Sequence, residues 1–167
     1  GGVVFGATFD ENWNVRHIAI EKKEQLQMLQ GSKYVQSFIG ETYKRAEKEL
    51  QYGRKVLFIG TPCQIQGLCR YLGKNYENLI LVDLICHGVP SNDIWQSYLG
   101  EISEGRKIVS FISRDKSKGI ENAPLIFEFE NGKLLREKYN KNIYLKLQNL
   151  RGIVCRYLQY ILEFQIR

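Results

Sequence analysis

The sequence predicts an α/β fold with a parallel strand-helix-strand core and an antiparallel β-hairpin extension. Two short apolar runs, Val56–Ile59 and Leu79–Ile85, are each followed by turn residues and then by a helical pattern. This spacing is typical of right-handed parallel crossovers. Farther along, Asn131-Gly132 separates two β-rich runs, which is a strong hairpin signal. Because open parallel sheets bind ligands beyond the carboxyl ends of their strands, the residues after the two apolar runs are the first candidates for a site.

Turn residues and helix stop signals place the remaining elements. The stretch Asp10–Asn14 suits a turn between two β-rich runs. Gly31 and Gly53 end two helical stretches, Pro62 suits the first turn of a third, and Ser91 can cap a fourth. The predicted strands are 3–9, 15–20, 56–59, 79–85, 108–113, 124–129 and 133–138, and the predicted helices are 21–30, 41–52, 63–72 and 92–102.

Composition limits the class of protein. The 167 residues are 44% hydrophobic, which suits one ordinary core and one globular unit. The net charge of +6 is spread along the chain, without the basic patches interleaved with aromatics that nucleic-acid sites require, so no nucleic acid is expected. No apolar run approaches the ~20 residues that cross a bilayer, so no membrane span is expected. Four cysteines without secretory features favour thiols or metal ligands in a reducing compartment, the cytoplasm.

Cysteines mark the ends of both apolar runs. Cys63 falls where a strand leads into a helix, so the helix dipole and free N–H groups would stabilise a thiolate, the form that a nucleophile or a metal ligand needs. The alternative is a small residue packed under a tight turn. Cys86 stands at the equivalent end of the neighbouring strand, so the two sulfurs are predicted to be neighbours across a crevice. Cys69 lies about a turn and a half beyond Cys63 on the predicted helix, faces elsewhere, and is interpreted as incidental.

Other polar residues are candidates on weaker signals. His87 could be a ligand, a proton donor, or a residue satisfied by a loop carbonyl. Asp83, inside an apolar run, would have to be paired or shift its pKa, or it could hydrogen-bond the next loop. Lys33 and Tyr34 offer a cation for a phosphate and a ring for stacking, although a surface lysine and a core tyrosine are the default. His17, in a strand, carries no signal.

Four motifs, in order, carry a family resemblance. The segments GGVVFGATFD, GSKYVQS, GTPCQIQGLCRYLG and LVDLICHGVPS resemble the C-terminal domain of the coenzyme F-420 hydrogenase/dehydrogenase beta-subunit family, from Gly1 to about Leu150. The resemblance implies an enzyme that binds FAD and carries four-iron (4Fe-4S) clusters. Such an enzyme passes electrons between an electron-transfer protein, or hydrogenase or dehydrogenase subunits, and a small-molecule acceptor such as a deazaflavin.

The resemblance also implies roles for individual residues. Cys63 and Cys86 match the motif cysteines and are the candidates for cluster ligation, and whether Cys155 adds a further ligand is open. His87 is expected close to the flavin, and His87 and Asp83 are the candidates for catalysis. The flavin pocket is expected to be shaped by Ser32, Lys33, Tyr34, Gly60, Thr61, Pro62 and Gln64.

The end of the chain departs from the family pattern. Family members continue after Leu150 with a proline and a closely spaced pair of cysteines, whereas here Gly152–Cys155 leads into RYLQYILEFQIR. We therefore predict an oxidoreductase domain over 1–150 and a divergent tail over 151–167. The chain opens inside a β-rich run without Met, so we interpret it as a piece that lacks an N-terminal part and could be inactive. Two alternatives stay open: an enzyme with Cys63 as nucleophile and His87 as base, and a non-catalytic binding subunit.

Overall fold

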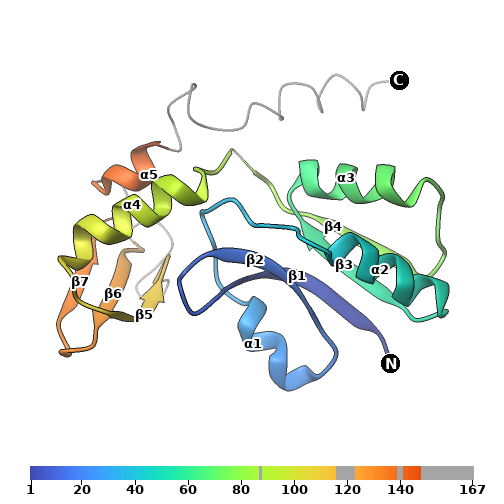
Figure 1. Ribbon diagram of the computed structural model, residues 1–167, viewed down its shortest axis with the longest axis horizontal. Coiled ribbons are helices and arrows are strands. Elements are labelled where there is room, and N and C mark those ends of the chain that lie inside the picture. The colour runs from blue at the N-terminus through green and yellow to red at the C-terminus, as the bar shows by residue number, and fades with distance from the viewer. Residues whose placement is uncertain (87, 116–122, 139–140, 148–167) are drawn as a thin grey trace. The chain divides into compact units, whose positions relative to one another are not determined.

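The computed structural model describes residues 1–86, 88–115, 123–138 and 141–147, and these residues form two compact units (Figure 1). The first unit contains residues 1–30 and 37–86. The second contains residues 31–36 and the described residues from Gly88 onward. Each unit has a sheet of its own, and each is described by itself.

The first unit is built on a four-stranded sheet with the strand order β2-β1-β3-β4. Strands β1 (Val3–Phe9) and β2 (Val15–Ile20) form the predicted antiparallel hairpin. In its turn, Asp10 accepts hydrogen bonds from the backbone N–H groups of Asn12 and Asn14. Strand β3 (Val56–Gly60) pairs in parallel with β1, and β4 (Leu79–Asp83) pairs in parallel with β3. The parallel strand-helix-strand core is therefore confirmed.

Helices cover the two faces of this sheet unequally (Figure 1). The helices α2 (Thr42–Gln51) and α3 (Pro62–Leu72) pack on one face. The core between them and the sheet consists of Val3, Phe5, Ala46, Leu50, Val56, Phe58, Ile65, Leu68 and Leu72. On the opposite face lie the short helices η1 (Lys23–Gln25) and α1 (Leu26–Leu29). Leu29 packs so close to Gly6 that a Cβ added at Gly6 would lie 3.1 Å from the Leu29 Cδ1.

The second unit combines a three-stranded antiparallel sheet with two helices. After α4 (Asn92–Ser103), whose N-cap is the predicted Ser91, the strands β5 (Ile108–Ile112), β6 (Leu125–Phe129) and β7 (Leu134–Glu137) lie in sequence order. The predicted hairpin at Asn131-Gly132 is confirmed, and Gly132 has a φ of 77°. Helix α5 (Ile143–Leu147) was not predicted. The core is aromatic: Trp95, Tyr98, Phe127 and Tyr144 are buried, and Phe111 stacks on Phe127.

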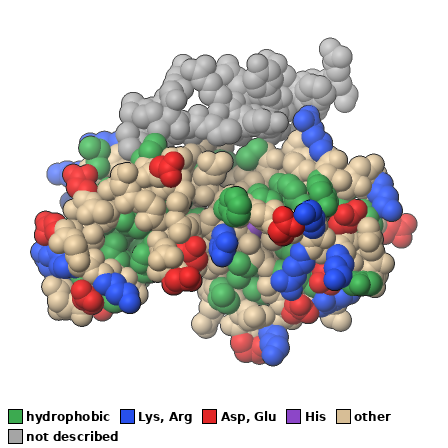
Figure 2. Space-filling view, viewed as in Figure 1, with side chains coloured by type: hydrophobic (Ala, Val, Ile, Leu, Met, Phe, Trp, Pro, Cys, Tyr) green, Lys and Arg blue, Asp and Glu red, His purple; other side chains and the backbone are tan. Residues whose placement is uncertain are grey.

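The surface agrees with the even charge distribution of the sequence. On the face shown in Figure 2, Lys and Arg side chains are interspersed with Asp and Glu. Within the residues that the structure describes, no helix is long and apolar enough to cross a membrane. The predicted α/β fold with an antiparallel extension is confirmed by the two sheets.

Candidate functional site

The turn from β3 into α3 is the first part of the candidate site. Thr61 is the N-cap of α3 and Pro62 occupies its first turn, where a missing N–H costs little. The backbone N–H of Thr61 donates to the Gln64 side-chain Oε1 at 3.0 Å. Gly60 allows this close turn, because an added Cβ would lie 3.2 Å from the same oxygen. The four residues therefore form a rigid strand-to-helix corner, as their pattern indicates.

Gln64 ties this corner to two other segments of the first unit. Its side-chain Nε2 donates to the carbonyl oxygen of Ser37 at 3.3 Å, and its backbone carbonyl accepts a hydrogen bond from the Tyr43 hydroxyl at 2.7 Å. Both ends of the Gln64 amide are thus bonded to the protein. Gln64 therefore shapes the corner, because its side-chain Oε1 and Nε2 each bond to the backbone of a different segment.

Cys63 stands exposed at this corner, in the first turn of α3. Its sulfur lies 3.1 Å from the Thr61 Oγ1. The Cys63 thiol is therefore accessible and has a hydroxyl beside it.

The end of β4 lies beside the end of β3, because Gly60 and Asp83 are register partners in the parallel pair. Cys86 follows three residues later, half-buried and not in a disulfide. The structure therefore brings the two candidate thiols to the ends of adjacent strands, as the sequence indicates. Asp83 is exposed, so the expectation of a buried carboxylate that needs a partner is wrong. His87 lies outside the described residues.

The thiols of the described residues do not by themselves complete a metal site. Cys63, Cys69 and Cys86 form no disulfides, and no group of three or more His, Cys, Asp or Glu side chains within the described ranges could hold a metal ion. Cys155 lies outside the described residues. The ligand role of Cys63 and Cys86 stays a prediction.

Ser32, Lys33 and Tyr34 belong to the second unit, where β5 and α5 hold their loop. The Ser113 hydroxyl donates to the Ser32 carbonyl, and the Tyr144 hydroxyl donates to the Tyr34 carbonyl at 2.8 Å. The Tyr34 hydroxyl accepts from Arg114 Nη1 at 3.3 Å. These bonds fix the loop backbone. The two groups of residues predicted to shape a flavin pocket therefore lie in different units, and their shared role stays a prediction.

Burial changes the acidity of Lys33. The side chain is half-buried, and desolvation of its ammonium group lowers its pKa to about 8. A cation whose charge is disfavoured in this way is stabilised when an anionic group binds beside it. Lys33 is thus suited to a phosphate or another anion, as its position in the loop predicts.

His17, which carried no signal in the sequence, is buried in the first unit beside the end of β3. Its Nε2 lies 3.0 Å from the carbonyl oxygen of Ile59 and its Nδ1 lies 2.7 Å from the Ser37 Oγ. A carbonyl can only accept, so Nε2 carries the proton and Nδ1 accepts from the serine hydroxyl. Burial lowers the pKa of this histidine, although the hydrogen bond to Ile59 opposes the shift. The alternation that buries Val15 in β2 also points to His17, two residues later.

The fold and the site together define a class: an α/β protein whose candidate chemistry lies at the carboxyl ends of adjacent parallel strands. Residues 53–152 match the family described as the C terminus of the coenzyme F420 hydrogenase/dehydrogenase beta subunit. This chain belongs to that family, and the resemblance stated from the motifs is confirmed. A search of curated proteins finds no match.

A solved structure shares the fold. A chain of the F420-reducing [NiFe] hydrogenase complex from Methanosarcina barkeri is similar to this chain with a TM-score of 0.51 and 18% sequence identity. The match covers 83% of this chain and 48% of that chain, so this chain spans about half the length of the hydrogenase chain. At this identity the likeness shows the fold alone.

Proposed function

We propose that this chain is part of a flavin- and iron-sulfur-dependent oxidoreductase. In this role it passes electrons between a cluster or ferredoxin-like partner, or hydrogenase or dehydrogenase subunits, and an organic acceptor such as a deazaflavin. One observation carries the proposal: the segment that matches the family, 53–152, contains both thiols at the ends of the adjacent strands β3 and β4, Cys63 and Cys86. A cytoplasmic location is part of the same proposal.

The residues present fit the proposed groups in part. A 4Fe-4S cluster takes four cysteine thiolates, and the strand-end thiols Cys63 and Cys86 have the required soft donor atom. Because the described residues offer no group of three such ligands, the remaining ligands of a cluster would come from residues outside them. For FAD, the rigid Gly60–Gln64 corner offers a backbone surface and Lys33 offers a half-buried cation.

The bound cofactors would supply the electron transfer, and the protein's task is to bind and orient them. Thr61 and Gln64 hold the corner backbone in one conformation through the 3.0 Å bond between them. Gly60 keeps the space beside Gln64 open. In the other unit, the Lys33 ammonium would be stabilised by an anionic group of the cofactor, which restores the charge that burial disfavours.

A visible spectrum tests the proposal directly. The chain is purified without oxygen, before and after incubation with FAD, iron and sulfide, and is compared with the variants Cys63→Ser and Cys69→Ser. We expect flavin bands and broad iron-sulfur absorption in the wild type. Cys69→Ser should keep the flavin bands, because Cys69 is exposed on the same helix but lies outside the strand-end pair. The cluster absorption should be lost in Cys63→Ser. A wild-type chain that stays colourless contradicts the proposal.

One observation favours a second candidate function, in which Cys63 is a nucleophile. Its exposed sulfur lies 3.1 Å from a hydroxyl at the N-terminus of α3, where an electrophilic substrate could reach it. This function predicts a colourless protein that iodoacetamide labels at Cys63 much faster than at Cys69. The spectrum and the labelling rates together separate the two functions.

A further inference from the structure

Strand β4 has exposed apolar side chains and, within the part of the chain that the structure describes, an open edge. It is the last strand in the order β2-β1-β3-β4. Ile80 is 56% exposed, Val82 is 39% exposed, and Leu81 on the other face of the strand is 37% exposed. Parallel strands with continuous apolar runs are normally covered on both faces. The exposed apolar side chains of β4 are therefore suited to contact another protein surface.

The outer side of the β4 backbone has no strand beside it in the described ranges. Val56 N–H donates to the Asn78 carbonyl at 2.8 Å, and Leu84 N–H donates to the Gly60 carbonyl at 2.9 Å. The even-numbered residues of β4 therefore direct their backbone groups toward β3. In a strand, alternate residues direct theirs to opposite sides, so those of Leu81 and Asp83 face the free edge. Among the described residues, no strand pairs with this edge.

We propose that the edge of β4 pairs antiparallel with β4 of a second copy of this chain, about a two-fold axis at Leu81. This pairing sets Leu81 opposite Leu81 of the second copy, and Ile80 opposite Val82. All the outward backbone groups then meet partners, because both copies offer their odd-numbered residues. The result is one continuous sheet without an open edge at β4, and the contact closes upon itself as a two-fold dimer requires.

The side chains of the edge suit this register. Leu79 lies opposite Asp83 of the second copy, so the two carboxylates are four residues apart along the strands, roughly 13 Å, and do not oppose each other. Ile80 and Val82 shield one another on the face that lacks α2 and α3. The alternative is a parallel, in-register pairing of the two β4 strands. In that pairing the Asp83 carboxylates of the two copies would lie opposite each other, and each added copy would expose a new open strand edge.

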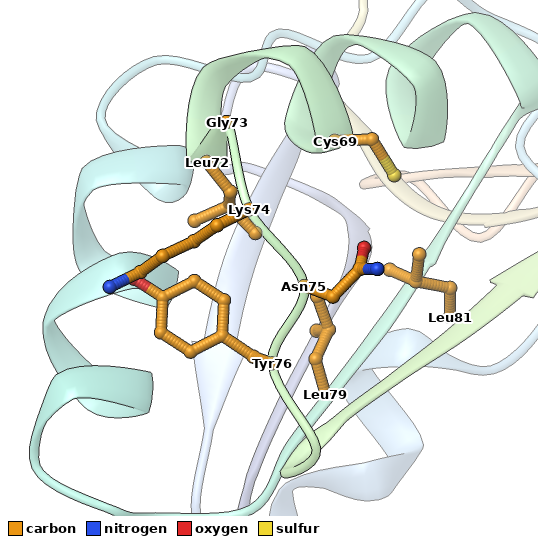
Figure 3. A pocket seen from close by; sticks show the side chains of 8 residues that line it. All are labelled: Cys69, Leu72, Gly73, Lys74, Asn75, Tyr76, Leu79 and Leu81. Carbon is orange, nitrogen blue, oxygen red and sulfur yellow. The ribbon is translucent and has the colours of Figure 1, made fainter.

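The opposite face of the edge offers a polar partner for the incoming carboxylate. An open hollow of about 570 Å³ lies between the end of α3 and β4, and Asn75, Leu79 and Leu81 are among its lining residues. Figure 3 shows the Asn75 and Leu81 side chains on one side of the Gly73–Tyr76 segment and Lys74 and Tyr76 on the other. Because Asp83 of the second copy stands opposite Leu79, the Asn75 amide can donate to its carboxylate.

A pair of charge variants tests the contact and its register together. In one variant Ile80→Lys is combined with Val82→Lys, and in the other Ile80→Lys is combined with Val82→Glu. Both positions are exposed, so both variants should fold, which circular dichroism checks. The dissociation constant of the full chain is measured by sedimentation velocity over a range of concentrations.

We expect a dimer for the wild type and for the Lys/Glu variant, because each lysine then opposes a glutamate of the second copy. For the Lys/Lys variant, two like-charge pairs should weaken the dimer by about tenfold or more. A monomeric wild type overturns the proposal. Equal dissociation constants for the two variants also overturn it, since any other register, or a different protein as the natural partner of this edge, would not distinguish them.

Discussion

At the scale of the residue, His17 is the clearest case of a buried polar group that organises its surroundings. It joins β2 to the carbonyl before the β3–α3 corner and to Ser37, and its ring stacks on Phe58 with centroids 5.4 Å apart. A polar residue in such a place must keep both ring nitrogens satisfied. Sequence alone could place Cys63 and Gln64 at a corner, because strand, proline and helix are local signals. It could not pair His17 with Ile59, because that contact joins segments 42 residues apart.

Replacing His17 with Ala should destabilise the folded protein. The change leaves the Ile59 carbonyl and the Ser37 hydroxyl without their partner, and we expect a loss of about 2 kcal/mol in the free energy of unfolding. Urea denaturation measures this loss. The neighbouring Arg16→Ala, at an exposed position of the same strand, should change the free energy by less than about 0.5 kcal/mol.

The same histidine predicts a pH dependence. Burial lowers its folded pKa below the ordinary value of 6.5, so the unfolded state binds more protons as the pH falls, and stability rises with pH in that window. The stabilising effect of His17 is therefore full above pH 6.5 and decreases as the pH falls from 6.5 toward the folded pKa. Urea titrations at several pH values measure the free energies of unfolding of the wild type and of His17→Ala. The difference between the two free energies should become smaller as the pH falls. A difference that is the same at every pH would contradict a neutral, buried histidine.

At the scale of the element, the contact between α2 and α3 depends on Gly67. A Cβ at Gly67 would lie 2.8 Å from the Tyr43 hydroxyl, which donates to the Gln64 carbonyl. The contact therefore couples the spacing of the two helices to the corner that carries Cys63. Local sequence patterns predict the two helices, but they do not predict the distance between them. In the sequence, Gly67 indicates only a lower helix propensity, and its close contact with Tyr43 becomes visible only in the structure.

Gly67→Ala should destabilise the protein by about 1 kcal/mol, although alanine is the better helix former, because the methyl group displaces the Tyr43 hydroxyl. Gly100→Ala in α4, where a Cβ meets nothing within 4 Å, should instead stabilise it by up to about 1 kcal/mol. Combining Gly67→Ala with Tyr43→Phe should recover part of the loss. Thermal and urea unfolding of these variants measure the changes, and equal gains from both alanines would show that the close contact does not matter.

Strand β4 shows where prediction at this scale ends. Its apolar run predicts a strand, and the strand is present at Leu79–Asp83, two residues shorter than the run. Whether a strand lies inside a sheet or at its edge depends on long-range pairing, which the run alone does not encode. Helix α5 was missed because it has only five residues and is stabilised by the buried Tyr144 and Leu145 rather than by its own periodicity.

At the scale of the whole molecule, two cores replace the one that length and composition suggested. The first unit packs aliphatic side chains, Phe5 and Phe58 between a sheet and two helices, whereas the second gathers aromatic rings around Trp95. Total hydrophobic content does not reveal how many cores a chain divides it among. The family match at 53–152 includes parts of both units.

The separate cores predict that damage to one unit stays local. Asn142 is buried in the second unit, where its Nδ2 donates to the Tyr98 hydroxyl at 2.7 Å and its Oδ1 accepts from the Leu145 N–H at 2.8 Å. Asn142→Ala should cost about 1–3 kcal/mol by leaving these buried groups unpaired. Hydrogen exchange followed by mass spectrometry should then show faster exchange in β6, β7 and α5, with β1 and β3 unchanged.

Lys141→Ala is the matched control, because Lys141 precedes Asn142 with an exposed side chain and should leave exchange unchanged in both units. Local opening is expected because the bonds of the Asn142 side chain stay within its own unit: its partners Tyr98, Glu137 and Leu145 all belong to the second unit. If Asn142→Ala instead accelerates exchange in β1 and β3 as much as in β6 and β7, the two cores open together, and the free energy that holds each sheet is shared across the chain.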